Sequence, residues 1–320
     1  MKFLIRSVPG LALAALLPSA AFASCGAAFC SVNSNWTSES AAVEPGSSLD
    51  LHYEFIDQNQ PRSGTNRVGV GAIPQDHDEV RTINRNLVAT YNHNFGSGWG
   101  ISVTAPLVNR DHQHIRNDNG TQEGESWNFT KPGDTRMVGR YQLPVFGDAS
   151  RPINLGFTFG LKLPTGKFKE ANAAGAVAER SLQPGSGTTD AIAGIYLHQQ
   201  LPAADASWFV QAQHQQALDS RDGYRPGSRT TADFGYRHGL TERLSAQVQL
   251  NLLHRGRDSG LAAEPADSGG RYAFVSPGLS YAVGSAVQVY GYVQLPVYQN
   301  VNGVQLTADK AVLFGVTSRF

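Results

Sequence analysis

The sequence predicts an all-β protein, a transmembrane antiparallel up-and-down β-barrel of about 12 strands. Three observations support this fold. Many segments of the 320-residue chain alternate apolar and polar residues with a period of two, as strands with one apolar face do. Short and long gaps between these segments follow each other in turn, which is the layout of a membrane barrel. After the first 23 residues, no stretch reaches 18 consecutive apolar residues, so a helical span is not expected.

Residues 1–23 have the pattern of a secretory signal peptide. Lys2 and Arg6 precede an apolar run over residues 8–17, and Ala21-Phe22-Ala23 supplies a small-x-small cleavage site. The apolar run is too short for a membrane helix, so we expect the segment to be removed. Phe22-Ala23-Ser24-Cys25 also fits a lipoprotein cleavage box, which leaves acylation of Cys25 as an alternative.

Residues 24–48 form a polar segment that we expect to lie in the periplasm or in the barrel lumen. It contains the only two cysteines, Cys25 and Cys30, and the oxidising compartment of an exported protein favours a disulfide between them. A metal site made by both thiolates and a histidine is the alternative. The mature chain keeps 26 acidic residues against 24 basic ones, because Lys2 and Arg6 leave with the signal peptide. Without a polybasic face, nucleic acid is not an expected partner.

Residues 49–320 contain the predicted barrel. The short gaps cover residues 96–99, 147–152, 202–206, 239–243 and 284–285. The long gaps cover residues 58–79, 109–132, 164–188, 219–227, 254–270 and 298–305. This order, with an even number of strands, predicts both chain ends on the periplasmic side of the outer membrane of a Gram-negative bacterium and the long loops outside.

Three strands show the alternation most clearly, over residues 49–55, 153–163 and 244–252. In the first, Leu49 and Leu51 alternate with Asp50, His52 and Glu54. We expect the apolar set of each strand to face lipid and the polar set to face the lumen. The segments near 80–95 and 207–217 are less regular: their lipid face includes Arg85, His93 and His214.

This register predicts a lumen lined by charged and histidine side chains. They are Asp50, His52, Glu54, Arg136, Arg140, Lys162, Asp190, Asp233, Arg237 and Asp309. Both signs of charge in a narrow barrel fit two interpretations. One is a salt-bridged lumen that stiffens the barrel, and the other is a narrow polar pore that selects solutes by charge and size.

The last strand, over residues 307–320, ends in Phe320 on the same face as Val312, Phe314 and Val316. This resembles the C-terminal signal by which the outer-membrane insertion machinery recognises barrel substrates. We therefore expect Phe320 to act as an assembly signal, with that machinery and the lipid bilayer as partners. An ordinary edge strand with a chance terminal phenylalanine is the alternative.

The sequence lacks the pattern of a known barrel hydrolase. Twelve-stranded outer-membrane phospholipases need a His-x-Ser arrangement on one strand, and no His-x-Ser occurs in this chain. Asp76-His77-Asp78 and Asp111-His112 leave an Asp/His hydrolase at the outer rim as the least favoured alternative. We expect no catalytic residues.

Two groups of residues offer ligands to a metal ion. His52 and His198 point into the lumen with Glu54, and His112-Gln113-His114 lies in the second predicted outer loop. Histidines in such positions are more often hydrogen-bonded in the lumen or solvated in a loop than bound to metal. We therefore expect neither a metal site nor a cofactor.

One hairpin carries a family resemblance. Leu163-Pro164-Thr165-Gly166 ends one strand, and residues 182–190, Leu-Gln-Pro-Gly-Ser-Gly-Thr-Thr-Asp, lead into the next. These elements resemble the Pro-Thr-Gly and Gln-Pro-Gly-x-Gly motifs of the transporter-like outer-membrane family named for the meta-pathway of phenol degradation. The resemblance covers the barrel, with motifs only in this hairpin, and it implies uptake of aromatic compounds. The segment from Cys25 to Cys30 departs from the plainest members.

Together these observations predict an outer-membrane channel or transporter for small solutes, including the aromatic or hydrophobic compounds that the resemblance implies. The alternative is a structural or accessory barrel linked to a periplasmic redox or metal-handling system, which the cysteine pair motivates. A TonB-dependent receptor is excluded, because about 22 strands and a plug need about twice this chain length.

Overall fold

The computed structural model describes residues 31–34, 45–118, 120–143 and 152–320. Its strands are β1 (Gly46–Gly64), β2 (Asn66–Arg67), β3 (His77–Gly96), β4 (Trp99–Asp118), β5 (Thr121–Pro132), β6 (Thr135–Gln142), β7 (Ile153–Leu163), β8 (Asp190–Leu201), β9 (Ala206–Ala217), β10 (Arg229–Gly239), β11 (Leu244–Arg255), β12 (Gly270–Ala282) and β13 (Val287–Arg319). A single-turn 3₁₀ helix covers Pro202–Ala204. Among the described residues, no helix combines the length and hydrophobicity needed to cross a bilayer.

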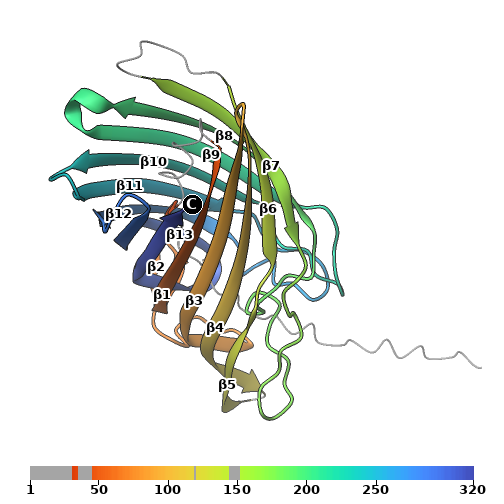
Figure 1. The fold of residues 1–320 in the computed structure, drawn as a ribbon. Coiled ribbons are helices and arrows are strands. Elements are labelled where there is room, and N and C mark those ends of the chain that lie inside the picture. Colours follow the sequence, from red (N-terminus) through yellow and green to blue (C-terminus); the bar gives the residue numbers. More distant parts are fainter. Residues whose placement is uncertain (1–30, 35–44, 119, 144–151) are drawn as a thin grey trace, which may run out of the picture.

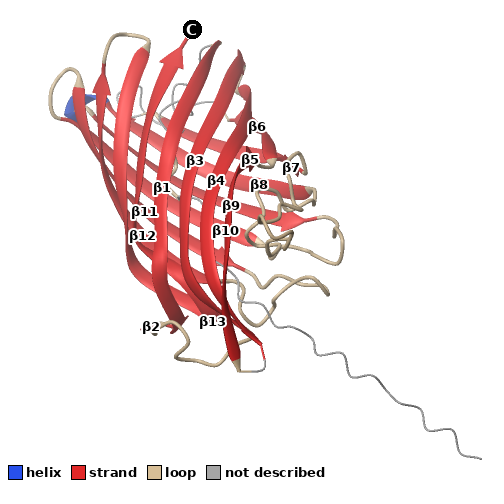
Figure 2. Cartoon of the chain, turned by 90° about the horizontal axis from the view of Figure 1, so that it is seen from below, coloured by secondary structure: helices blue, strands red, loops and turns tan. Residues whose placement is uncertain are grey.

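The strands form one antiparallel sheet that closes on itself (Figures 1 and 2). Neighbours follow the chain order from β1 through β3, β4 and β6 to β13, and β13 pairs with β1 to close the ring. Two strands lie outside the ring, since β2 pairs only with β1 and β5 pairs only with β4. The predicted up-and-down barrel is confirmed.

β13 accounts for two crossings of the barrel wall. It spans 33 residues; its first half, up to Val301, pairs antiparallel with β12, and its second half, from Val301 onward, pairs antiparallel with β1. The chain reverses near Gly303, which has a φ of 56°. The backbone N–H of Arg319 donates to the carbonyl of Ala286, beside the start of β13. The eleven elements of the ring therefore make twelve crossings, in agreement with the predicted count of about 12.

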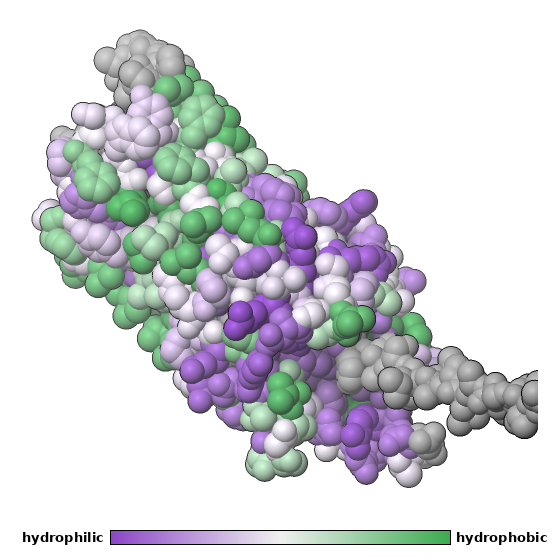
Figure 3. Space-filling view, turned by 90° about the vertical axis from the view of Figure 1, so that its right-hand side faces the viewer, coloured by the Kyte–Doolittle hydropathy of each residue, from purple (hydrophilic) through white to green (hydrophobic). Residues whose placement is uncertain are grey.

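The two faces of the wall differ as the alternation predicts. On β1, Leu49 is 46 % exposed while Asp50 is 0 % exposed. On β7 and β11 the same contrast separates exposed leucine, phenylalanine and valine from buried threonine, glutamine and asparagine. Apolar side chains gather over the upper part of the barrel in Figure 3, and polar ones over the end that carries the long loops. The apolar belt is the surface that a bilayer covers in a membrane barrel.

The predicted loop over residues 109–132 is wrong. β4 continues to Asp118 and pairs with β5 from Leu107 and Pro132 up to Asp118 and Thr121. This hairpin rises beyond the apolar belt, so its outer face is polar, and its apolar side chains Trp127 and Phe129 are buried on the other face. That pattern is the reverse of the one expected for a strand with a lipid-facing apolar side. The gap over residues 58–79 is also shorter than predicted, because β1 runs to Gly64 and β3 starts at His77.

The start of β1 and the C-terminal residue meet at the end of the short turns. Phe320 donates its N–H to the carbonyl of Ser47 and accepts a bond from the Ser47 N–H. The turn between β3 and β4 has two central residues, Ser97 and Gly98, with φ values of 53° and 83°, as a type I′ hairpin turn requires. Cys25, Cys30, the signal peptide and most of the predicted turn over residues 147–152 lie outside the described residues.

Candidate functional site: a polar cavity in the barrel lumen

The lumen holds a cavity of about 450 Å³. Its walls come from β1, β3, β4 and β6 to β10, and residues 31–34 and 180–186 also line it. Threonine, serine, glutamine and asparagine together make up 14 of the 31 lining residues. The charged ones are Glu54, Asp134, Asp190, Asp233, Arg136, Lys162, Arg180 and Arg229. Acidic and basic groups are therefore equal in number, and the wall has no net charge apart from His52.

The predicted lumen residues fall into three groups. His52, Glu54, Arg136, Lys162, Asp190 and Asp233 line this cavity. Asp50 and Arg140 are buried without lining it, Asp50 among hydrogen bonds from His52, Tyr290 and Thr317, and Arg140 against Asn94. Arg237 lies at the short-turn end, 3.3 Å from Asp205.

The placement of Asp309 in the lumen is wrong. Its side chain is 50 % exposed and lies 2.8 Å from Arg67 of β2. The register between β1 and β13 shifts at this point, because Ile56 pairs with Ala311 but Gln58 pairs with Ala308. An extra residue in one strand changes which face the following side chains occupy. Period-two counting from Phe320 could not detect that bulge.

Residues 31–34 cross the lumen on one side of the cavity. The backbone of Asn33 exchanges two hydrogen bonds with Gln249 of β11, of 3.0 and 2.9 Å. Its side chain donates to Gln211 of β9 at 2.6 Å, and Gln294 of β13 donates to Ser31 at 2.8 Å. These contacts tie the segment to three separate strands.

Asp134 organises the other side of the cavity. It accepts hydrogen bonds from the Gly166 N–H at 3.1 Å and from the Ser186 N–H and hydroxyl at 2.9 Å each. The Lys162 ammonium lies 2.9 Å from Asp134 and 3.2 Å from Asp190. The two family-like elements, around Gly166 and Ser186, are therefore fastened to one buried carboxylate. Sequence reasoning missed Asp134, although Pro-Gly-Asp at residues 132–134 marks the break between β5 and β6.

Glycines in these elements allow three backbone segments to meet. A Cβ on Gly166 would lie 2.7 Å from the carbonyl carbon of Gly133 and 2.8 Å from the Cα of Gly185. A Cβ on Gly185 would lie 2.6 Å from Asp134. Real side chains do not approach backbone so closely, so only glycine fits here. The loop over residues 164–189 is thus packed against the rim of the barrel.

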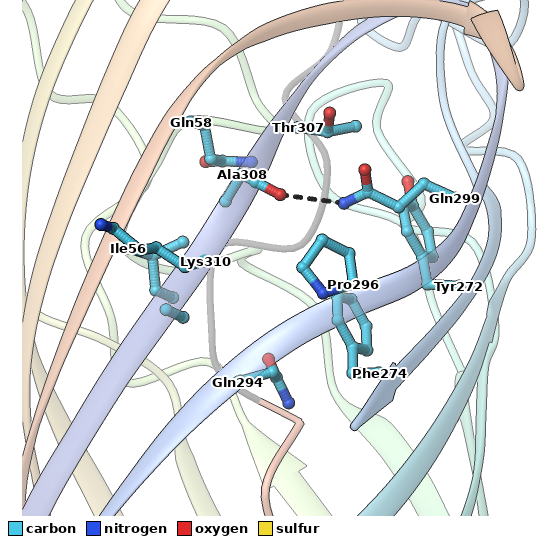
Figure 4. A pocket seen from close by; sticks show the side chains of 11 residues that line it. Ile56, Gln58, Tyr272, Phe274, Gln294, Pro296, Gln299, Thr307, Ala308 and Lys310 are labelled. Atoms are coloured by element: carbon cyan, nitrogen blue, oxygen red, sulfur yellow. Dashed lines mark hydrogen bonds between the residues drawn. The ribbon is translucent and has the colours of Figure 1, made fainter. Parts of the chain in front are cut away.

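A second, smaller cavity lies in the wall where β1, β12 and both halves of β13 meet (Figure 4). Gln299 donates to the carbonyl of Ala308 across it, at 3.1 Å. Its volume is about 30 Å³, which is room for water and not for an organic solute. The lumen cavity is therefore the candidate site.

The structure does not gather the metal ligands that the lumen histidines suggested. His198 is buried on β8, but it forms no group with His52 and Glu54. Among the described residues, one set of three metal-ligand side chains converges: His77, His114 and Glu179.

No protein-family model and no curated protein matches the sequence. Among solved structures, the chain is similar to the COG4313 outer membrane channel from Pseudomonas putida F1, with a TM-score of 0.63 and 10 % identity over 86 % of this chain and 96 % of that one. It also matches the TodX deltaS2S3 mutant monoaromatic hydrocarbon channel, with a TM-score of 0.44 and 11 % identity over 93 % of this chain and 97 % of that one. The first likeness shows that this chain has the fold of an outer-membrane barrel.

Proposed function

We propose that the protein is a channel for small solutes in the outer membrane of a Gram-negative bacterium, with both chain ends in the periplasm. The observation that carries the proposal is the polar cavity of about 450 Å³ inside a barrel with an apolar outer face. That volume lies within the range of about 300–1,000 Å³ typical of small-molecule sites.

The charges on the cavity wall indicate which class of solute the channel would pass. Four acidic and four basic side chains line the cavity, so a solute without net charge avoids strong attraction or repulsion there. The resemblance to the meta-pathway family adds aromatic compounds to the proposal. The polar wall favours aromatics that carry hydroxyl or zwitterionic groups over plain hydrocarbons, because a hydrocarbon would leave the wall's polar groups without partners.

Liposome swelling tests this proposal. Full-length mature protein in liposomes should speed swelling in isosmotic phenylalanine and in hydroxybenzyl alcohol, compared with liposomes without protein. Arg136→Gln should slow the uptake of hydroxybenzoate, an anion, more than that of phenylalanine. Arg81→Gln, at an exposed ion pair outside the cavity, is the matched control and should change neither rate. Rates equal to those of empty liposomes for every solute, both for the wild type and for a variant in which the loop over residues 164–189 is released, would refute the channel.

A structural barrel is the second candidate, and one observation favours it. Residues 31–34 cross the lumen, and the loop over residues 164–189 is fastened at the rim, on two sides of the cavity. If neither the wild-type protein nor a variant with that loop released passes any solute, we would conclude that the protein is a structural barrel and not a channel.

The proposal extends to the N-terminus. We expect residues 1–23 to be removed and Cys25 and Cys30 to form a disulfide in the oxidising periplasm. Mass spectrometry of the unreduced mature protein should give a mass lower than that of the reduced chain by two hydrogen atoms. Free labelling of both thiols without reductant would contradict the disulfide, and an added acyl mass would indicate a lipoprotein.

A further inference from the structure

Three histidines and a glutamate meet at the end of the barrel that carries the long loops. His77 begins β3, His112 and His114 lie on the inner face of β4, and Glu179 belongs to the loop over residues 164–189. All three imidazoles are at most 5 % exposed. Trp127 of β5 covers the rings of His112 and His114 and donates its indole N–H to the carbonyl of Ala176. Residues distant in sequence are thus held together beneath one loop.

The ligand atoms are spaced as a metal ion requires. Glu179 Oε1 lies 2.9 Å from His77 Nε2 and 3.6 Å from His114 Nδ1. His112 Nε2 lies 3.4 Å from His114 Nδ1. Tetrahedral zinc with Zn–N and Zn–O bonds of about 2.0–2.1 Å places neighbouring ligand atoms about 3.4 Å apart. The atoms of His77, His114 and Glu179 all lie within 4.8 Å of one another.

Each histidine of β4 has an outer partner on its other nitrogen. His114 Nε2 lies 3.0 Å from Glu125 of β5. His112 Nδ1 lies 2.8 Å from the Thr82 hydroxyl and 3.6 Å from Glu79. Metal-binding imidazoles are oriented in this way, with a carboxylate or hydroxyl fixing the tautomer and leaving the opposite nitrogen for the metal.

The neighbourhood is rich in buried carboxylates. Glu79 is 2 % exposed, and the side chain of Glu179 is 9 % exposed. A divalent cation would offset the negative charge that these two buried carboxylates carry when ionised.

We propose that His77, His114 and Glu179, with His112 as the fourth ligand, bind one divalent transition-metal ion of the zinc class. Imidazole ligands with one carboxylate suit zinc, and also copper and nickel. The ion would tie the loop over residues 164–189 to β3 and β4, so it would stabilise the closed arrangement of that loop over the lumen. This inference does not depend on which solute the barrel passes.

Metal analysis of the whole mature protein tests the site. Protein carrying no histidine tag is freed of metal with EDTA, loaded with Zn²⁺, desalted and analysed by mass spectrometry for zinc. We expect one zinc per chain. Co²⁺ in place of zinc should give the visible absorption of a tetrahedral site. His77→Asn, His114→Asn and Glu179→Gln should each weaken zinc binding more than about tenfold, because even the loss of an outer partner costs about 10- to 100-fold.

Several controls keep the result interpretable. His214→Gln/His254→Gln, at exposed histidines elsewhere, should still bind one zinc, and so should Cys25→Ser/Cys30→Ser. Heat-modifiable migration in SDS gels confirms that each variant has folded. Zinc should also slow trypsin cleavage after Arg180, next to Glu179, in the wild type and not in Glu179→Gln. No stoichiometric zinc in the folded wild type, or zinc that is lost only with the cysteines, would overturn the proposal.

Discussion

Replacing Asp134 by alanine should release the loop over residues 164–189. The Asp134 carboxylate is only 8 % exposed and pairs with Lys162, which is 9 % exposed. Removing one partner of such a buried pair costs about 3–5 kcal/mol. Lys162 keeps Asp190 at 3.2 Å, so we expect the lower end, about 3 kcal/mol. Because about 1.4 kcal/mol is a factor of ten, the population with an open loop should rise by about a hundredfold.

Trypsin measures this opening directly, because the loop contains Lys167, Lys169 and Arg180. When opening is fast compared with cleavage, the rate follows the open population. Asp222→Asn is the matched control: it removes an ion pair to the same loop, with Lys169, and asparagine tolerates the left-handed backbone at this position. The side chains of Lys169 and Asp222 are 68 % and 43 % exposed. We expect less than a fivefold change for this control, since exposed pairs contribute about 0–1 kcal/mol. Equal cleavage rates for the two variants would refute the role of Asp134.

Three further predictions concern other parts of the molecule. Gly166→Ala should also speed trypsin cleavage of the loop, because its Cβ would lie 2.7 Å from the Gly133 backbone; an unchanged rate would contradict the close packing. Asn33→Ala removes the side-chain bond to Gln211 and should raise single-channel conductance, whereas an unchanged conductance would mean that residues 31–34 do not narrow the passage. Deleting Phe320 should lower the folded fraction recovered from outer membranes, measured by heat-modifiable gel migration, and normal recovery would exclude it as an assembly signal.

The strands of the barrel could be predicted from the sequence wherever one face of the strand contacts lipid. Leu49 and Asp50, one residue apart, fall on opposite faces of the wall because only one face of the strand meets the bilayer. The two-residue turn at Ser97 was equally readable, since glycines flank a position that needs a positive φ. In both cases a local constraint, contact with lipid or a positive φ, determines which residue types fit at each position.

Prediction failed where the constraint comes from distant residues. The β4–β5 hairpin beyond the bilayer has no lipid to impose apolar residues on its outer face, so its sequence pattern predicts a loop. That error also placed His112 and His114 in solvent, whereas they are buried on β4. Glu179 joins them through a loop contact that crosses more than sixty positions of sequence. Asp134 could not be identified from its sequence neighbours either, because its partners Gly166, Ser186 and Lys162 are all distant in sequence.

The most direct test of the channel is to record currents across planar bilayers that contain the purified, folded protein. We expect discrete single-channel steps and nearly equal permeability for K⁺ and Cl⁻, because the acidic and basic side chains of the cavity are equal in number. Asp134→Ala should increase the step size if the loop over residues 164–189 limits the passage. A folded protein that gives no steps, with or without that substitution, would contradict the proposed channel.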